Sequence, residues 1–272
     1  MQIFIDSGDI DEIREAMSWG VVDGVTTNPS LVRAASLKRG IVDLKEYLSE
    51  ICNVAGRGRP VSLEVMGTNC EQMVKEAKII YDKFNTVAKN VVVKIPVTTK
   101  GIEEDEFEGI KAIRQLDSRG IPVNATLIMT PMQAMLAAKA GAKYVSPFLG
   151  RIDDYVRQKS GINFKKEDYF DTTTLRRNAN DDALNFNEGI LSGIELLLRI
   201  RKSFANYNIK AKVIAASIRN TRQAEESMEA GAEIITAPYE VIKNMTLHTK
   251  SEEGIKLFVE DAKKAKYIEL FS

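Results

Sequence analysis

The stretch Val91-Val92-Val93-Lys94-Ile95-Pro96 decides the fold class. A β-branched run that ends at a proline is typical of a strand buried on both faces, as in a parallel sheet covered by helices. Lys94 is the exception in this run, because a buried ammonium must lose its proton or find a partner. A neutral amine at this place would be a nucleophile for carbonyl compounds, whereas a structural lysine would extend to solvent or pair with an acid.

Other β-rich runs alternate with longer amphipathic stretches along the chain, which predicts a repeated strand-helix unit. The eight predicted strands cover residues 3–7, 22–27, 61–65, 91–96, 123–128, 144–148, 212–216 and 233–237. Eight units fit one closed (β/α)8 barrel, the TIM barrel, which spans residues 1–272 as a single domain. A doubly wound open sheet is the alternative, but such a sheet normally carries a glycine-rich dinucleotide-binding turn, and the sequence contains none.

Two stretches do not follow the repeated unit. Residues 153–187 hold many polar and few apolar residues, which predicts an inserted loop that is either a lid or a solvated excursion. Residues 251–271 are predicted to form a C-terminal helix with apolar residues at its end. These apolar residues pack either on a neighbouring subunit or on the same barrel.

Composition limits the chemistry. The chain has 38 lysine plus arginine residues and 38 aspartate plus glutamate residues. Its net charge is therefore zero, and no overall electrostatic attraction favours binding to nucleic acid or to an anionic membrane. The chain lacks a signal-like start and a membrane-spanning apolar run, which predicts a cytoplasmic protein. The single histidine, His248, and the absence of zinc-type cysteine spacing leave no basis for a histidine triad or a metal site. We therefore expect no metal, and proton transfer by carboxylates, lysine or water.

Polar residues recur near the carboxyl ends of the predicted strands, two apart and so on one face. Barrel active sites lie at this end. Singly, Asp6 has an alternative role as a helix cap, Asn28 as a turn residue and Glu64 as an ion-pair partner. Together with Lys94, these residues supply a nucleophile, a proton shuttle and hydrogen bonds for a polyhydroxy chain. The strand-end residues are Asp6, Thr26, Asn28, Ser62, Glu64, Lys94, Asn124, Thr126, Ser146 and Ser217.

Two arginines follow late strands. Arg151 and Arg219 each come just after a predicted strand, where a guanidinium and nearby backbone N–H groups can hold a phosphate. Either arginine alone is also compatible with a salt bridge, but the pair matches the usual phosphate site of a barrel. The sequence therefore predicts a phosphorylated or similarly anionic substrate.

Over nearly its whole length the chain resembles the transaldolase family, particularly its short microbial members and the related fructose 6-phosphate aldolases. The resemblance rests on the segments Phe4-Ile5-Asp6, Asp23-Gly24-Val25-Thr26-Thr27-Asn28-Pro29-Ser30-Leu31, Val92-Val93-Lys94-Ile95-Pro96, Asn124-Ala125-Thr126-Leu127-Ile128, Ser146-Pro147-Phe148-Leu149-Gly150-Arg151-Ile152-Asp153-Asp154 and Ala215-Ala216-Ser217-Ile218-Arg219.

The resemblance implies a cofactor-free enzyme in which Lys94 forms a Schiff base with a ketose. Asp6 would handle the proton of the hydroxyl whose carbon-carbon bond breaks, and Glu64, through a water near Thr126, would shuttle protons. The substrate-binding residues that the resemblance implies are Thr27, Asn28, Asn124, Ser146, Phe148, Arg151, Ser217 and Arg219.

The implied reaction moves a dihydroxyacetone unit between sugar phosphates, from fructose 6-phosphate or sedoheptulose 7-phosphate to an aldose phosphate. The related aldolases release free dihydroxyacetone instead. Glu64 and Phe148 favour transfer, because the aldolases carry Gln and Tyr there. The longer segment at 153–187 leaves donor and acceptor open, and sulfofructose transaldolases are similar too, since an arginine pocket can hold a sulfonate.

Short members of the family form rings of subunits, which implies that this protein is a homo-oligomer, a pentamer or decamer. A non-catalytic sugar-phosphate binding protein on the same fold is the remaining alternative.

Overall fold

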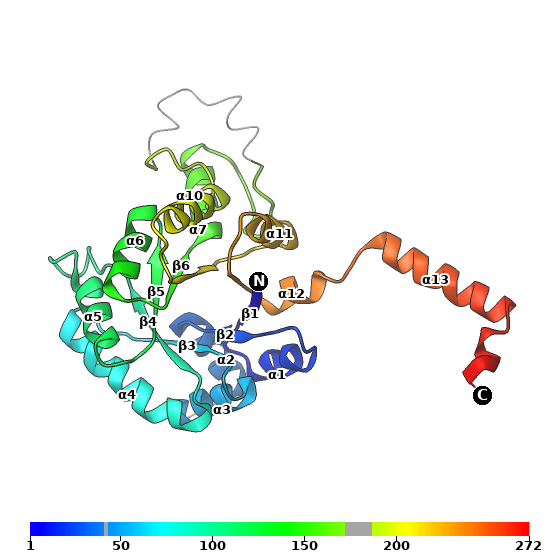
Figure 1. Ribbon diagram of the computed structural model, residues 1–272, viewed down its shortest axis with the longest axis horizontal. Helices are drawn as coiled ribbons and strands as arrows, with labels where there is room; N and C mark the ends of the chain where they lie inside the picture. Colours follow the sequence, from blue (N-terminus) through cyan, green and yellow to red (C-terminus); the bar gives the residue numbers. More distant parts are fainter. Residues whose placement is uncertain (41–42, 172–186, 272) are drawn as a thin grey trace.

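The fold is a closed barrel of eight parallel strands in the computed structural model, which describes residues 1–40, 43–171 and 187–271 (Figure 1). Each strand pairs with the next along the chain, and the last pairs with the first. The predicted (β/α)8 barrel is therefore confirmed. Its strands are β1 (Gln2–Asp6), β2 (Gly24–Thr26), β3 (Val61–Glu64), β4 (Val91–Pro96), β5 (Val123–Ile128), β6 (Tyr144–Pro147), β7 (Lys212–Ala215) and β8 (Ile234–Ala237).

Helices follow the strands and cover the outside of the barrel (Figure 1). A glycine in the left-handed conformation ends α6 and lets the chain turn into β6. The described helices are α1 (Ile10–Ser18), α2 (Pro29–Arg39), α3 (Leu44–Ala55), α4 (Cys70–Ala88), α5 (Glu108–Asp117), α6 (Pro131–Ala140), α7 (Leu149–Lys159), α10 (Gly193–Asn206), α11 (Thr221–Glu229), α12 (Tyr239–Asn244), α13 (Thr249–Lys264) and the 3₁₀ helix η1 (Tyr267–Phe271).

Two apolar regions explain why β4 is buried on both faces. Val91, Val93 and Ile95 belong to the large core between the strands and the surrounding helices. Val92 belongs to a small cluster whose other members also come from the strands. Alternation places Lys94 on the face of Val92, one step nearer the carboxyl end of the strand. The small cluster consists of Phe4, Val92, Tyr144, Ile214 and Ile234, and it fills the barrel below the polar residues.

The irregular segment after β6 begins later than the sequence pattern predicted. Residues 149–159 form α7, which follows β6 directly, so 153–159 belong to a regular helix of the barrel. Residues 160–171 contain turns, a bend and chain without regular secondary structure, 172–186 lie outside the described residues, and α10 begins at Gly193. The predicted inserted segment is thus shorter than 153–187 at its amino-terminal side.

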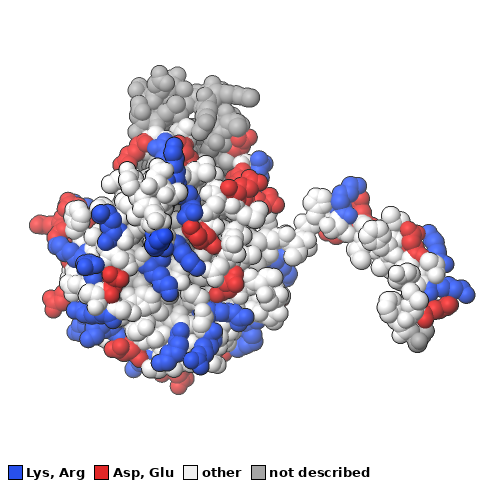
Figure 2. Space-filling model, in the orientation of Figure 1, with Lys and Arg blue, Asp and Glu red and all other residues white. Residues whose placement is uncertain are grey.

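The C-terminal helix leaves the barrel. Helix α13 and η1 extend away from it on a short connection (Figure 1), and α13 has no buried residue. Packing on the same barrel, one of the two expectations for this end, is therefore not observed. On the face in Figure 2, positive and negative side chains are mixed over the barrel and along α13. No helix in the described ranges has the length and apolar character needed to cross a membrane.

Candidate active site

Lys94 lies on β4 inside the barrel with 5% of its surface exposed. Its Nζ donates a hydrogen bond to the Thr27 carbonyl oxygen at 3.0 Å and lies 3.1 Å from Glu64 Oε2. Glu64 is the register partner of Lys94 on β3, which explains why the two side chains meet. The sequence led us to expect that a buried amine either loses its proton or finds a partner. In the structure Lys94 has a partner, Glu64, whose carboxylate is also a proton acceptor.

Asp6 ends β1 and lines the same cavity as Lys94. Thr26 Oγ1 donates to Asp6 Oδ1 at 2.7 Å, and the same hydroxyl lies 2.6 Å from Thr236 Oγ1. Burial raises the pKa of Asp6 above its usual value; Lys94, the Thr26 hydrogen bond and Arg219 oppose this effect without cancelling it. The carboxylate is therefore a stronger base than an exposed aspartate.

Three buried polar side chains form a hydrogen-bonded row across β3, β5 and β6. Ser146 Oγ donates to Asn124 Oδ1 at 2.7 Å, and Asn124 Nδ2 donates to Ser62 Oγ at 3.2 Å. Thr126 is also fully buried, yet its hydroxyl has no hydrogen-bond partner within the described part of the chain. A buried hydroxyl without a partner is costly, and a water beside Thr126 would remove this cost.

The cavity at the carboxyl ends of the strands has a volume of about 490 Å³. Glu64 and Thr27 do not line the cavity, but both contact Lys94, which does. Asn124 does not line the cavity either, but it accepts a hydrogen bond from Ser146, which does. Thr126 lies on the adjacent strand as the register partner of Pro96. The predicted residues that line the cavity are Asp6, Thr26, Asn28, Lys94, Ser146, Phe148, Arg151, Ser217 and Arg219.

Arg219 lies at the rim of the cavity in an ionic chain. Its Nη2 donates to Asp154 Oδ2 at 3.1 Å, and the other oxygen of Asp154 lies 3.2 Å from Arg157 Nη2. Arg157 is 2% exposed. Arg151 stacks on Phe148, with 5.4 Å from its Cζ to the ring centroid. The sequence predicted the two rim arginines, but it did not predict the buried Arg157 behind them.

Gly150 lets the start of α7 approach the loop after β7. A Cβ at Gly150 would lie 2.2 Å from the Ser217 carbonyl oxygen and 2.5 Å from Arg219 Nε. Ser217 itself has a φ of 61°, a conformation that is strained for a residue other than glycine. This close approach joins the two arginine-bearing segments, because Gly150 N donates to the Ser217 oxygen at 3.1 Å.

Sequence reasoning missed several residues that line the cavity. Tyr155 and Gln158 follow Arg151 by four and seven positions, which is one face of a helix, but the segment was predicted to be irregular. Thr236 shares the inner face of β8 with Ile234, so strand alternation contained that signal. Lys166 has no such signal, because its place depends on tertiary contacts.

The site brings together a buried amine, two carboxylates, several hydroxyl and amide groups, and two rim arginines. An amine of this kind can form an imine with a ketone, and the carboxylates can move protons. Within the described ranges, no three His, Cys, Asp or Glu side chains are arranged to hold a metal ion. The catalytic role of each residue stays a prediction.

Comparison with known proteins agrees with this geometry. The family model described as transaldolase/fructose-6-phosphate aldolase matches residues 3–270. A probable transaldolase of Caldicellulosiruptor saccharolyticus is 41% identical over 265 residues, covering 97% of this chain and 98% of the relative. Probable transaldolases of Clostridium perfringens and Thermoplasma acidophilum are 38% and 39% identical, over 97% of this chain and 99% and 96% of their own lengths. The chain therefore belongs to the transaldolase/fructose-6-phosphate aldolase family of enzymes.

Proposed function

We propose that this protein is a transaldolase that moves a dihydroxyacetone unit from a ketose phosphate to an aldose phosphate through a Schiff base on Lys94. Fructose 6-phosphate and sedoheptulose 7-phosphate are the proposed donors. The observation that carries the proposal is the position of Lys94, which is paired with Glu64 and lines one cavity with Asp6 and the two rim arginines. The family membership and the names of the relatives support the same reaction.

The first proposed step forms the imine. Glu64 accepts a proton from the Lys94 ammonium across the 3.1 Å contact, and the free amine attacks C2 of the ketose to form a carbon-nitrogen bond. A proton moves from the attacking nitrogen to the C2 oxygen, which becomes a hydroxyl, and Glu64 returns its proton to this hydroxyl through a water near Thr126. That hydroxyl leaves as water, and a protonated imine remains on Lys94. The hydroxyl of Thr126, which has no hydrogen-bond partner among the described residues, supports this place for the water.

The second proposed step breaks the carbon-carbon bond. Asp6 removes the proton of the C4 hydroxyl, the C3–C4 bond breaks, and its electron pair moves into the protonated imine to give an enamine. The raised pKa of Asp6 suits this role as a base. In the reverse sense, C3 of the enamine attacks the aldehyde carbon of the acceptor, Asp6 protonates the new alkoxide, and water hydrolyses the imine.

Transfer is favoured over release of free dihydroxyacetone by Phe148. Its ring centroid lies 6.0 Å from Lys94 Nζ, and a phenyl ring has no hydroxyl to hold a water beside the enamine. Protonation of the enamine is what would release the three-carbon unit. An assay with and without an aldose phosphate separates the two reactions, and free dihydroxyacetone as the main product in both would contradict transfer.

Borohydride trapping tests the Schiff base. Hydride reduces the imine to a stable secondary amine, so incubation with fructose 6-phosphate and borohydride should leave an adduct on the peptide that contains Lys94. We expect Lys94→Met to form no adduct and to lose turnover by at least about 10³-fold. Lys143→Met, at an exposed position, is the control and should keep both. An adduct on another lysine, or none in the wild type, would contradict the mechanism.

We also propose that the protein is a homo-oligomer in which α13 packs on a second copy of the chain. Ile255, Phe258 and Val259 are spaced as one helix face, and they are 59%, 68% and 46% exposed. An isolated helix of this length is marginally stable in water. An apolar face on such a helix is therefore typical of a segment that packs against another surface.

Sedimentation of the full chain tests this proposal. We expect the wild type to form a multi-subunit ring, a pentamer or decamer, and Phe258→Glu to shift it to smaller species. Lys256→Gln, on the same helix, is the control and should leave the assembly intact. A monomeric wild type would refute the proposal while leaving the Schiff-base mechanism untouched.

A further inference from the structure

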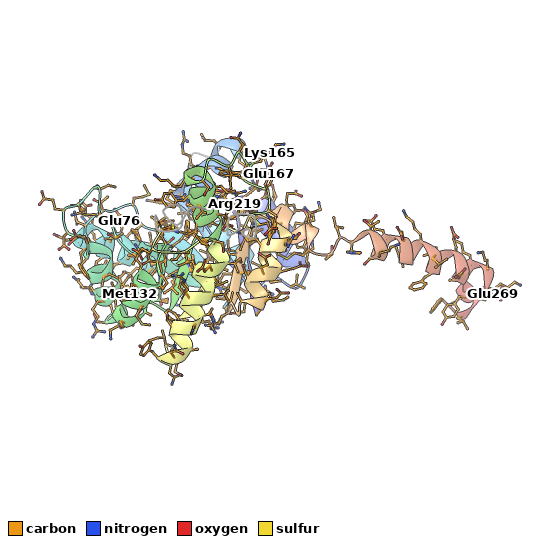
Figure 3. The ribbon with its side chains drawn as sticks, turned by 90° about the horizontal axis from the view of Figure 1, so that it is seen from above. Glu76, Met132, Lys165, Glu167, Arg219 and Glu269 are labelled. Carbon is orange, nitrogen blue, oxygen red and sulfur yellow. The ribbon has the colours of Figure 1, made fainter. Side chains whose placement is uncertain are left out.

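The cavity has a third rim cation, Lys166, from the irregular segment after α7. It lines the same cavity as Arg151, Ser217 and Arg219. Its sequence neighbours Lys165 and Glu167 are labelled beside Arg219 in Figure 3. A tight turn holds the backbone here, because Lys165 N donates to Asp168 Oδ2 at 2.7 Å and Asp168 N donates to the Lys165 oxygen at 3.1 Å.

This turn is fixed to the two elements that carry the rim arginines. The buried Arg157 of α7 donates to the Asp168 carbonyl oxygen at 3.2 Å, and its Cζ lies 3.8 Å from the ring centroid of Phe164. On the other side, Asn220 Nδ2 donates to the Glu167 oxygen at 3.1 Å. Asn220 caps α11 directly after Arg219, so the contacts hold the Lys166 backbone near Arg219.

The three positively charged side chains at the rim differ in whether a carboxylate neutralises them. Arg219 is paired with Asp154 at 3.1 Å, and Asp154 is shared with Arg157. In contrast, neither Arg151 nor Lys166 forms an ion pair with any residue in the described ranges. Two uncompensated positive charges therefore border the end of the cavity that we assign to the anionic group of the sugar.

We propose that Lys166 is a specificity-determining residue that, together with Arg151, selects a doubly charged phosphate ester over a singly charged sulfonate or an uncharged sugar. This inference rests on the proposed transaldolase function and assigns the substrate class of the same site. A phosphate monoester carries close to two negative charges at neutral pH, because its second pKa is about 6. A sulfonate carries one. Arg151 and Lys166, which have no carboxylate partner in the described ranges, together carry two positive charges. They match the charge of the phosphate ester and exceed that of the sulfonate.

Kinetics with three donors test the proposal: fructose 6-phosphate, 6-deoxy-6-sulfofructose and fructose. We expect Lys166→Gln to raise KM for fructose 6-phosphate by roughly 5- to 10-fold with kcat within about twofold, as for loss of one charge-assisted contact. The rise should be about twofold for the sulfonate and absent for fructose. Lys165→Gln is the matched control with the same change of charge, and Lys166→Arg should restore most of the affinity.

The pH dependence adds a readout that a purely structural role would not move. The KM ratio of Lys166→Gln to wild type for fructose 6-phosphate should fall when the pH is lowered from 7.5 to 5.5, because the phosphate becomes singly charged. The ratio for the sulfonate should not change.

Two results would overturn the inference. One is an equal rise of KM in Lys165→Gln and Lys166→Gln, which would indicate a general surface potential. The other is an equal effect of Lys166→Gln on all three donors. In both cases borohydride trapping on Lys94 would still support the proposed function, whereas absence of the trapped adduct in the wild type would remove the function and the inference together.

Discussion

The two ends of the cavity are built differently. At the inner end, Lys94 and Asn124 lie on strands, are buried, and contact neighbours fixed by strand register. At the rim, Arg151, Arg219 and Lys166 come from a helix and from loops. Strands hold atoms where bond formation needs them, to within fractions of an ångström. Charges at a rim act over longer distances and tolerate looser positions. The comparison predicts that changes at the inner end act on kcat and changes at the rim act on KM.

The largest expected effect is at the inner end. Asp6→Asn removes the proposed base, and we expect kcat to fall by about 10²- to 10⁴-fold with a small change in KM. Asp6 must be ionised to act, so wild-type activity should fall as the pH drops through its raised pKa. A kcat–pH profile measures this, and the acidic limb should disappear in the variant.

A second variant sharpens the result for Asp6. The Thr26 hydrogen bond lowers the pKa of Asp6, so Thr26→Val should move the acidic limb of the profile to higher pH. Asn28→Ala, at another residue that lines the cavity, removes no hydrogen bond to Asp6 and should leave the limb in place. An unchanged limb in Thr26→Val would mean that another group controls it.

An intermediate effect is expected behind the rim. Arg157→Met removes the contacts of this buried arginine with Asp154 and with the Asp168 carbonyl oxygen. Because Asp154 keeps Arg219 as a partner, we expect a loss of about 2 kcal/mol in the free energy of unfolding, less than for a fully orphaned buried charge. KM for fructose 6-phosphate should rise several-fold, with kcat nearly unchanged.

Chemical denaturation and steady-state kinetics of Arg157→Met give the two quantities. Lys159→Met, an exposed position on α7, is the control and should change neither. If kcat falls in Arg157→Met as much for fructose as for fructose 6-phosphate, the separation of the two ends is wrong.

The same division explains what the sequence could predict. The strands were predictable because β-branched runs with a proline or glycine at one end are strong local signals, and β4 and β5 match their predicted bounds. Strand alternation then places Asp6, Glu64 and Lys94 at one end of the barrel, since the side-chain period of two is a local property. The pairing of Lys94 with Glu64 follows from adjacent strands in register.

The rim was less predictable because its contacts are between segments distant in sequence. Leu149, Ile152 and Val156 have helical spacing and are all buried, so α7 was within reach of pattern analysis. The charged residues between them hid this signal. Arg157 is buried because Phe164 and Phe170 cover it, and no local pattern predicts a buried arginine. Lys166 likewise lines the cavity because contacts with residues distant in sequence hold its segment in place.

The smallest effect on turnover is expected at Asp153, which lies behind the rim without lining the active-site cavity. It accepts hydrogen bonds from Gly193 N and Gln223 Nε2, each at 2.7 Å, and burial raises its pKa to about 6. Between pH 4 and 6 the folded protein keeps a proton that the unfolded chain has lost, so stability falls as the pH rises through this range, by about 3 kcal/mol in total. Asp153→Asn cannot titrate, so its unfolding free energy should lack this component, while kcat and KM stay within about twofold. Asp117→Asn, at an exposed carboxyl, should keep the wild-type slope; the same slope in Asp153→Asn would show that Asp153 is not the group that titrates.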